Sequence, residues 1–318
     1  MITNIIIGLI GLVLILIIIG MLYEFVESRR ARRFYDDVPG ERVDMGGYAL
    51  HIKPMGHRQA GQPAVILEAS VGANSLDWQM VQPLIAERAQ VISYDRAGNG
   101  WSDTAPDPRT PDQLADDLHR LLTHAGIAPP YLLVGHRYGG MYVRKYQEKY
   151  PEQVVGLVLV DASHPEIFNE EDNRAEISRL ERNVSVFQRL GLVRMVTRRN
   201  NRVTHLDEAL QAQYVAMMMH DNANLLAEAK PILLDGITLP DSLDIPLTVV
   251  SRAEDLDLQQ ERRWAEFQRD LANLSPQNKH VHTETTRRWI VFAEPHTIAD
   301  AVLDTLTPHD QTDDEVDQ

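Results

Sequence analysis

The chain of 318 residues contains no cysteine. That absence excludes disulfide bonds, catalysis by a thiolate and zinc sites built from cysteine. It leaves the cellular compartment open, because a chain without thiols is compatible with either redox state. Since 44% of the residues are hydrophobic, the chain can still bury a substantial core.

Positive charge is also scarce. There are 31 Lys and Arg residues against 46 Asp and Glu residues, so the formal net charge is -15. Binding to nucleic acid needs a basic face that neutralises phosphates, so no nucleic-acid partner is expected. Part of the negative charge lies in residues 308–318, which are predicted to form an acidic disordered tail. No internal repeat is evident, and we expect no cofactor and no metal.

A long uncharged run lies near the N-terminus. Residues 5–23 are rich in Ile and Leu and show no polar face, and a helix of this length crosses a hydrocarbon core at about 1.5 Å per residue. A cleaved signal peptide is the alternative, but residues 1–4 carry no basic side chain and no Ala-x-Ala site follows. We therefore predict a transmembrane anchor over residues 1–23, with the lipid bilayer as its partner.

Basic residues follow this run. The predicted juxtamembrane linker, residues 24–40, holds Arg29, Arg30, Arg32 and Arg33. Because positively charged flanks tend to stay on the inner side, they predict a single-pass membrane protein with a cytoplasmic globular part.

From residue 41 onward, short apolar strands alternate with helices. Strands are expected at residues 63–69, 90–95, 131–136 and 154–161, and helices at 77–88, 111–125 and 138–150. Because the strands are apolar on both faces, the sequence predicts an α/β fold with a mostly parallel sheet flanked by helices.

The alternation stops at residue 164. Only helices are expected up to residue 240, at 176–190 and 206–229, before strands at 246–251 and 280–284 and helices at 259–274 and 295–306. The core is therefore predicted over residues 41–163 and 241–307, with a helical lid over residues 164–240 inserted between them. A mixed apolar and basic segment of this lid, residues 190–202, is expected either to pack on the core or to rest on anionic lipid.

Three motifs identify a family. They are Asp-Arg-Ala-Gly-Asn-Gly-Trp-Ser-Asp at 95–103, Leu-Val-Gly-His-Arg-Tyr-Gly-Gly at 133–140 and Leu-Val-Leu-Val-Asp-Ala-Ser-His-Pro at 157–165. With these motifs in this order, residues 41–307 resemble the α/β-hydrolases. The resemblance implies an α/β-hydrolase fold with a helical lid, and hydrolysis of esters, amides or similar substrates.

The second motif departs from the family at its centre. A Gly-x-Ser-x-Gly turn places the nucleophilic serine where this chain has Arg137. Gly135 and Gly139 suit a tight strand-to-helix turn that side chains would obstruct. The N–H of Tyr138 would open the following helix and can donate to an oxyanion, and the resemblance implies a second such donor at Val71.

A second departure follows the last strand. The family has its catalytic histidine there, and the matching stretch, residues 286–290, has Arg288. Arginine cannot take a proton from a serine and return it to a leaving group at neutral pH. Arg287 and Ser70 also stand where the family has glycine. One engineered change at residue 137 would leave the histidine in place, so a naturally inactive relative is the better interpretation.

The resemblance implies that a catalytic carboxylate remains. The acid follows either the strand before the lid, which gives Asp161, or the strand after it. The second position gives Asp255, with Glu254 and Asp257 as alternatives.

Two arginines in one pocket need counter-charges. One interpretation is a structural cluster, in which these carboxylates pair with Arg137 and Arg288 and fill the pocket. The other is an anion site, in which both guanidinium groups, Ser70 and His136 hold a small anionic or amphipathic ligand.

The sequence thus predicts a membrane-anchored hydrolase-like protein without catalytic activity, which binds such a ligand or a protein partner. One alternative is an active hydrolase with a non-standard site, in which Asp161 or Asp255 activates water. Another is a membrane scaffold with a blocked pocket.

Overall fold

A single sheet forms the centre of the molecule. The computed structural model describes residues 2–167, 186–187, 189–198, 207–254 and 258–307. In these residues eight strands lie in the order β1-β2-β4-β3-β5-β6-β7-β8. They are β1 (Glu41–Asp44), β2 (Ala49–Met55), β3 (Ala64–Glu68), β4 (Val91–Tyr94), β5 (Tyr131–His136), β6 (Val154–Val160), β7 (Leu247–Ser251) and β8 (Asn278–His282). At one edge β2 pairs antiparallel with both β1 and β4. All the other pairs of neighbouring strands are parallel, which confirms the mostly parallel sheet.

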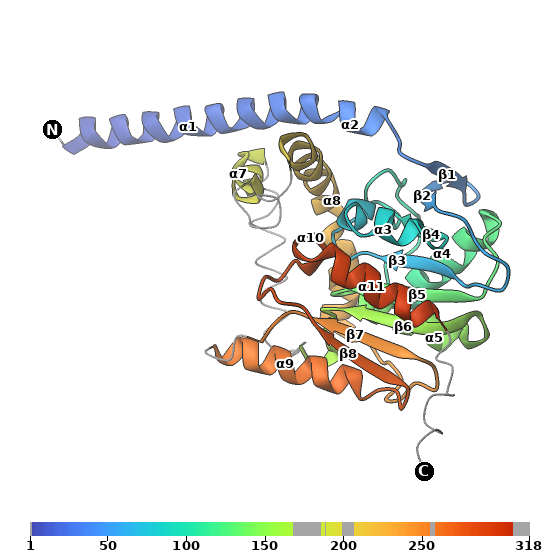
Figure 1. Cartoon of the computed structure of the whole chain (residues 1–318). Coiled ribbons are helices and arrows are strands. Elements are labelled where there is room, and N and C mark those ends of the chain that lie inside the picture. Colours follow the sequence, from blue (N-terminus) through green and yellow to red (C-terminus); the bar gives the residue numbers. More distant parts are fainter. Residues whose placement is uncertain (1, 168–185, 188, 199–206, 255–257, 308–318) are drawn as a thin grey trace, which may run out of the picture.

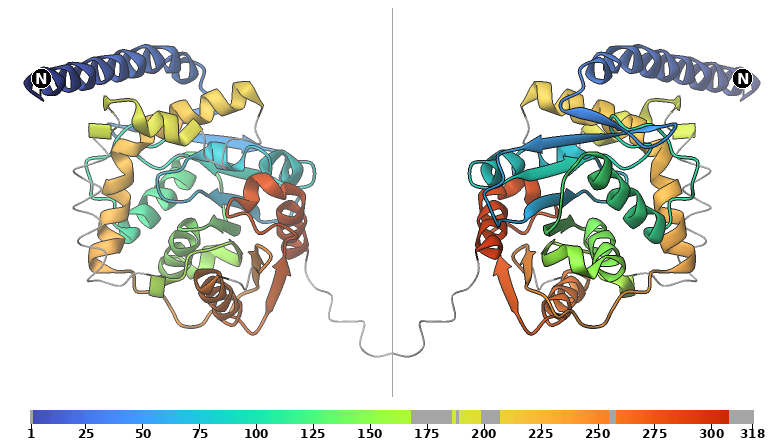
Figure 2. Two further views of the ribbon diagram at one scale, coloured as in Figure 1. Left: turned by 90° about the vertical axis from the view of Figure 1, so that its left-hand side faces the viewer. Right: turned by 90° about the vertical axis from the view of Figure 1, so that its right-hand side faces the viewer.

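Helices cover both faces of this sheet (Figures 1 and 2). β3, β4, β5 and β7 are buried along their whole length. Successive residues contribute to opposite faces, so Val65 and Leu67 belong to one apolar core and Ile66 to the other. Burial on both faces explains why these strands are continuous apolar runs in the sequence.

Each core has its own helices. The first contains η1 (Ser75–Trp78), α3 (Gln82–Ala86), α10 (Ile290–Ala293) and α11 (Pro295–Leu306). The second contains α4 (Pro111–His124), α5 (Gly139–Lys149) and α9 (Gln259–Ala272), and η2 (Pro151–Gln153) precedes β6. The single helix expected over residues 77–88 is wrong, because the chain forms η1 and then α3. Pro83 explains the break, since a proline inside a helix removes one hydrogen bond and clashes with the preceding turn.

Between β6 and β7 the chain leaves the sheet. We call residues 164–240 the insert; its described helices are η3 (Pro165–Ile167), α7 (Leu192–Arg198) and α8 (Glu208–Asp235). The side chain of Asp207 accepts a hydrogen bond from Leu210 N at 2.9 Å and so begins α8. The helix expected at 176–190 lies almost wholly outside the described residues, as do Asp255, Asp257 and the acidic tail.

The N-terminal helix α1 (Ile2–Ala31) is followed by the short α2 (Arg33–Asp36). One 18-residue window of this region has a mean hydropathy of 3.3, and none of that window is buried. The N-terminal part of α1 stands clear of the domain (Figure 1). By length and composition α1 could therefore span a membrane.

Side chains of the domain hold the segment that follows α1. Trp101 Nε1 donates to the carbonyl of Phe34 at 3.1 Å. A ring nitrogen of His51 lies 2.7 Å from the carbonyl oxygen of Pro39, and its other nitrogen lies 2.8 Å from Asp95 Oδ2. Burial lowers the pKa of His51, but the Asp95 carboxylate outweighs burial and the net pKa is raised. Burial raises the pKa of Asp95, but His51 and the N–H groups of Trp101 and Ser75 outweigh it, so that pKa is lowered.

The buried pair of His51 and Asp95 predicts a pH-dependent stability. A raised histidine pKa contributes stability that is complete below the ordinary value of 6.5 and is lost as pH rises through the folded-state pKa. In thermal unfolding of the full chain in detergent micelles, His51→Gln should therefore flatten the decline in stability above pH 6.5. The variant His57→Gln, at an exposed histidine, serves as the control. Equal alkaline slopes for the wild type and His51→Gln would contradict the prediction.

Candidate functional site

The candidate site lies at the carboxyl ends of three neighbouring strands. Arg137 follows β5, Asp161 follows β6 and Arg252 follows β7. Arg137 and Asp161 both have positive φ, at 51° and 43°. Side chains other than glycine rarely adopt this conformation, so both turns hold local strain of a kind that clusters at functional sites.

Two glycines make the turn at Arg137 possible. A Cβ atom at Gly135 would lie 2.5 Å from the carbonyl oxygen of Gly139, and a Cβ at Gly139 would lie 2.5 Å from that of Glu68. The backbone of Arg137 is fixed on both sides, since its N–H donates to Val160 O at 3.1 Å and its carbonyl accepts from Ser163 N at 2.9 Å. The tight strand-to-helix turn is therefore held by close backbone packing.

Asp161 is the centre of the site. Its carboxylate is fully buried and accepts hydrogen bonds from three side chains. Arg252 Nη1 donates to Oδ2 at 2.6 Å, Arg137 Nη1 donates to Oδ2 at 3.1 Å, and Trp264 Nε1 donates to Oδ1 at 2.7 Å. Buried charges of this kind persist only when they are paired and hydrogen-bonded.

A second carboxylate, Glu261, lies at the start of α9. Arg252 Nη2 donates to Oε2 at 2.6 Å and Arg288 Nη2 donates to Oε1 at 3.2 Å. Burial raises the pKa of Glu261, but the two guanidinium groups outweigh it and the pKa is lowered. Arg252 thus bridges the buried carboxylate of Asp161 and the half-buried carboxylate of Glu261.

Aromatic rings complete the packing of these arginines. The guanidinium carbons of Arg137 and Arg252 lie 4.6 Å and 4.8 Å from the ring centre of Trp264. Arg137 also lies 5.7 Å from the ring centre of Trp289. Arginine stacks on tryptophan through the negative face of the ring, so Trp264 stabilises both cations besides donating to Asp161.

A cavity of about 610 Å³ opens beside this cluster. Among the described residues, its lining contains four arginines and one carboxylate: Arg137, Arg252, Arg263, Arg288 and Glu261, with Ile167, Gln259, Gln260, Trp264 and Phe267. The side chain of Arg288 is 52% exposed and that of Arg137 18% exposed. Burial lowers the pKa of Arg137 and Asp161 offsets part of this effect, but a guanidinium remains protonated at neutral pH. The charges of the described residues therefore leave the cavity positive.

The structure brings some of the expected residues together. Arg137 and Arg288 line the same cavity, and Asp161 lies beneath it. Glu254 is directed elsewhere, because it accepts a hydrogen bond from Arg269 Nη1 at 2.7 Å. Asp255 lies outside the described residues, so the structure does not place it.

Other expected residues lie outside this lining. Val71 and Ser70 belong to the loop after β3, and Tyr138 is the residue before α5. Arg96 holds this loop, since its Nη2 donates to the Ser70 carbonyl at 2.8 Å and to Glu228 Oε2 at 2.8 Å. Glu228, on α8, also accepts from the N–H of Gly72 at 3.3 Å. The loop that would supply an oxyanion donor is thus tied to the insert by a buried ion pair.

His136 is buried beneath the turn and does not line the cavity. Its ring lies 3.7 Å from Asp77 Oδ2 and packs edge-on against Trp78 and Trp289. Burial lowers the pKa of His136, and Asp77 offsets only part of that effect. This histidine is therefore neutral at pH 7 and acts as part of the core.

Sequence reasoning missed four residues of the site. Arg252, Glu261, Arg263 and Trp264 were not expected at the site. A signal was present, because Glu261 and Trp264 are three residues apart and so share one face of α9. Only the packing of α9 against β7 shows that this face is directed at Asp161.

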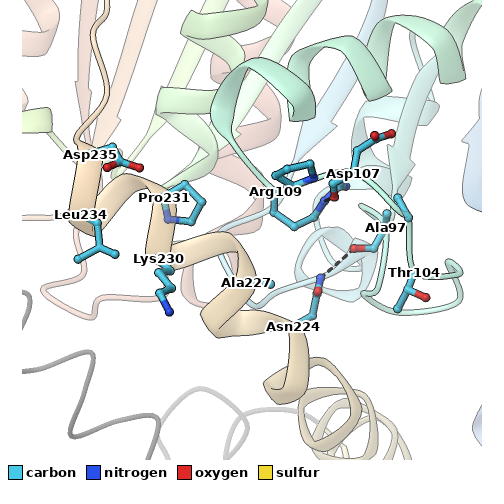
Figure 3. Close-up of a pocket in the computed structure, with 12 residues that line it drawn as sticks. Ala97, Thr104, Asp107, Arg109, Asn224, Ala227, Lys230, Pro231, Leu234 and Asp235 are labelled. Carbon is cyan, nitrogen blue, oxygen red and sulfur yellow. Dashed lines mark hydrogen bonds between the residues drawn. The ribbon is translucent and has the colours of Figure 1, made fainter.

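A separate cavity of about 490 Å³ lies between α8 and the loop after β4 (Figure 3). Asn224 Nδ2 donates to the Ala97 carbonyl at 2.8 Å on its floor. Arg109 lines this cavity but pairs with the buried Asp117 at 2.9 Å. The charged residues of its lining are Asp107, Arg109, Lys230 and Asp235, so the formal charges of the lining sum to zero. In the described part of the chain, no three His, Asp or Glu side chains are grouped as a metal site.

Comparisons with known proteins agree with this architecture. Residues 63–215 match the sequence profile of a family described as alpha/beta hydrolase fold. The chain superposes on a thermophilic esterase from Thermogutta terrifontis with a TM-score of 0.63, covering 84% of this chain and 99% of that one. At 19% sequence identity, this likeness shows the fold alone.

Curated relatives match only in part. The chain is 36% identical over 126 residues to a probable transporter, efuK, of Hormonema carpetanum, a match that covers 38% of this chain and 18% of that protein. It is 34% identical over 113 residues to an AB hydrolase superfamily protein of Gibberella zeae, covering 34% of this chain and 35% of that protein. The chain thus spans less than half the length of these relatives.

The cluster around Asp161 predicts a large loss of stability when its charge is removed. In Asp161→Asn, Arg137 loses its counter-charge and Arg252 keeps only Glu261, and breaking a buried ion pair costs about 3–5 kcal/mol. Denaturant unfolding of the full chain in micelles should show a loss of that order. Asp300→Asn, at an exposed position on α11, should leave the free energy of unfolding nearly unchanged. A similar small change in both variants would refute the central role of Asp161.

Proposed function

This chain has the α/β-hydrolase fold, and we propose that it uses the fold to bind a small organic anion rather than to hydrolyse an ester. The observation that carries the proposal is the arginine-lined cavity at the position where hydrolases of this fold act. In the proposal the protein is a membrane-anchored pseudoenzyme, with α1 in the bilayer and the domain on the cytoplasmic side.

The chemistry of the lining supports the lack of hydrolysis. Arg137 occupies the strained turn that would present a nucleophile, and an arginine has no nucleophilic lone pair at neutral pH. Of the described residues that line the cavity, none is Ser, Thr, Cys or His. A hydrolase of the serine type needs such a group and a base that can exchange its proton.

The same lining suits an anion. Guanidinium groups form paired hydrogen bonds with carboxylates and phosphates, and Arg288 and Arg263 are the exposed cations of the cavity. Trp264, Phe267 and Ile167 add apolar surface for the organic part of a ligand. A small anionic or amphipathic molecule therefore fits better than a neutral one.

Two other functions are supported less well. A hydrolase in which Asp161 activates water would need a carboxylate free to accept a proton, but three donors already occupy Asp161. The same alternative with Asp255 depends on a residue outside those that the structure describes. A scaffold with a blocked pocket agrees with the ion pairs of Arg137 and Arg252. It does not account for a cavity of about 610 Å³ that remains beside them.

Ligand binding can be tested with phenyl phosphate and, as a neutral molecule of similar shape, benzyl alcohol. The full chain in lipid nanodiscs should bind the anion, with a change in tryptophan fluorescence, and not the alcohol. Arg288→Gln should weaken binding about tenfold, which corresponds to about 1.4 kcal/mol for one lost charged hydrogen bond. Arg269→Gln is the matched control, because Arg269 lies on α9 but pairs with Glu254. Equal binding of both molecules, or equal loss in both variants, would overturn the proposal.

The proposal also predicts no esterase activity. Purified full-length protein should not hydrolyse p-nitrophenyl butyrate faster than buffer alone, because the described residues of the cavity lining include no Ser, Thr, Cys or His. Turnover faster than buffer alone would overturn this prediction and support the alternative in which Asp161 or Asp255 activates water.

A further inference from the structure

We infer that the described residues of the insert at and just before α7 rest on the surface of the bilayer that α1 enters, with their exposed apolar side chains in the interfacial layer. The inference rests on the part of the proposed function that makes α1 a membrane anchor. It adds a second membrane contact, made by a segment far from α1 in the sequence.

An ion pair joins the insert to α1. Arg194, on α7, is buried and donates to both carboxylate oxygens of Glu24, from Nε at 2.9 Å and from Nη2 at 2.7 Å. Its Nη2 also lies 3.3 Å from Ser28 Oγ. A guanidinium that holds both oxygens of one carboxylate fixes the orientation as well as the distance of the two helices.

The backbone of α1 also contacts the backbone of the insert. A Cβ atom at Gly20 would lie 2.5 Å from the carbonyl oxygen of Leu190, so only glycine allows this approach. The next residue, Gly191, packs against the ring of Tyr23. At Gly11, by contrast, a Cβ atom would meet nothing within 4 Å. The contact is therefore confined to the C-terminal end of the apolar run.

The position of this contact sets the depth of the insert. A transmembrane helix needs about 20 apolar residues, and the run in α1 ends at Tyr23 with Glu24 as the first charged residue. Tyrosine is enriched at the boundary between hydrocarbon and water. Gly20 and Tyr23 thus lie at that boundary, and the part of the insert that touches them lies there too.

The insert presents apolar side chains at this level. Val186, Phe187, Leu192 and Met195 are between 43% and 53% exposed. α7 lies beside α1 in the views of Figures 1 and 2, so this apolar set adjoins the exposed apolar surface of α1. An exposed apolar set of this kind marks a contact surface, and its continuity with the anchor favours lipid as the occupant.

The arrangement also orients the arginine-lined cavity. The parallel strands point toward the side of the domain where α7 lies and from which α1 extends (Figure 1). The cavity is at the carboxyl ends of β5, β6 and β7, on that same side. An amphipathic anion in the bilayer would therefore reach the cavity from the membrane side.

Fluorescent labelling can test the docking, because the chain contains no cysteine. A polarity-sensitive probe is placed on Met195→Cys and, as the control, on Val155→Cys. Val155 is 43% exposed but lies at the start of β6, the opposite end of the strands. In vesicles of phosphatidylcholine and phosphatidylglycerol, the probe at 195 should shift to the blue. Spin-labelled lipids should quench it several-fold more strongly than the probe at 155. Equal weak quenching at both sites would overturn the inference.

The link between insert and anchor supplies a second test. Gly20→Val should force α1 away from Leu190 and reduce the quenching at 195, whereas Gly11→Val should not. Arg194→Glu should also reduce it, and combining this change with Glu24→Arg should restore it by reversing the ion pair. If neither Gly20→Val nor Arg194→Glu changes the quenching, the link to α1 does not hold the insert at the membrane.

Two further outcomes distinguish failure of the membrane anchor from failure of the docking. If the protein does not float with vesicles, or if alkaline extraction removes it from them, α1 is not a membrane anchor and the proposed function must change. If the protein stays with the vesicles and the probe at 195 shifts to the blue but is not quenched by spin-labelled lipids, a second copy of the chain covers the insert. Disulfide cross-linking of unlabelled Met195→Cys would then confirm that occupant and exclude lipid docking.

Discussion

The buried carboxylate of Asp161 is the interaction on which the site depends. Two guanidinium groups and one indole N–H converge on it from β5, β7 and α9. Two cations in a poorly solvated place would repel each other and lose hydration, and the charge of Asp161, which Arg137 and Arg252 share, offsets both effects. The same pairing keeps the carboxylate from serving as a base. In the function proposed here, the pairing that stabilises the cluster thus also keeps Asp161 from activating water.

The turn at Arg137 retains the geometry of a hydrolase while its chemistry differs. Its positive φ and its two close-packed glycines would present a nucleophile, and here they present a guanidinium. The neighbouring loop is held in a comparable way, because Arg96 and Glu228 bind its backbone to the insert. Rigid surroundings of this kind preserve the shape of a pocket when its reactive groups are replaced. In the function proposed here, that preserved shape accommodates an anion.

A series of contacts connects α1 to the site. α1 contacts the insert through Glu24 and Gly20, and the insert contacts the loop beside the site through Glu228. A ligand cavity at the carboxyl ends of the strands and an anchor on the same side suit a ligand that partitions into lipid. The arginines would then select its charged head, and Trp264 and Phe267 its apolar part.

Local patterns in the sequence determined most of the fold. Continuous apolar runs identified the parallel strands, the helix at 295–306 matches α11, and glycines at 135 and 139 marked the turn. The sequence also showed that arginine stands at residues 137 and 288. The sequence offered Asp161 as one of several possible partners of these arginines, and tertiary structure decided that Arg137 pairs with Asp161 and Arg288 with Glu261. Asp161, Arg252, Glu261 and Trp264 come from three elements spread over about a hundred residues, and no local period relates them. Charge pairing between residues so far apart in the sequence depends on how helices pack on the sheet, here on the packing of α9 against β7.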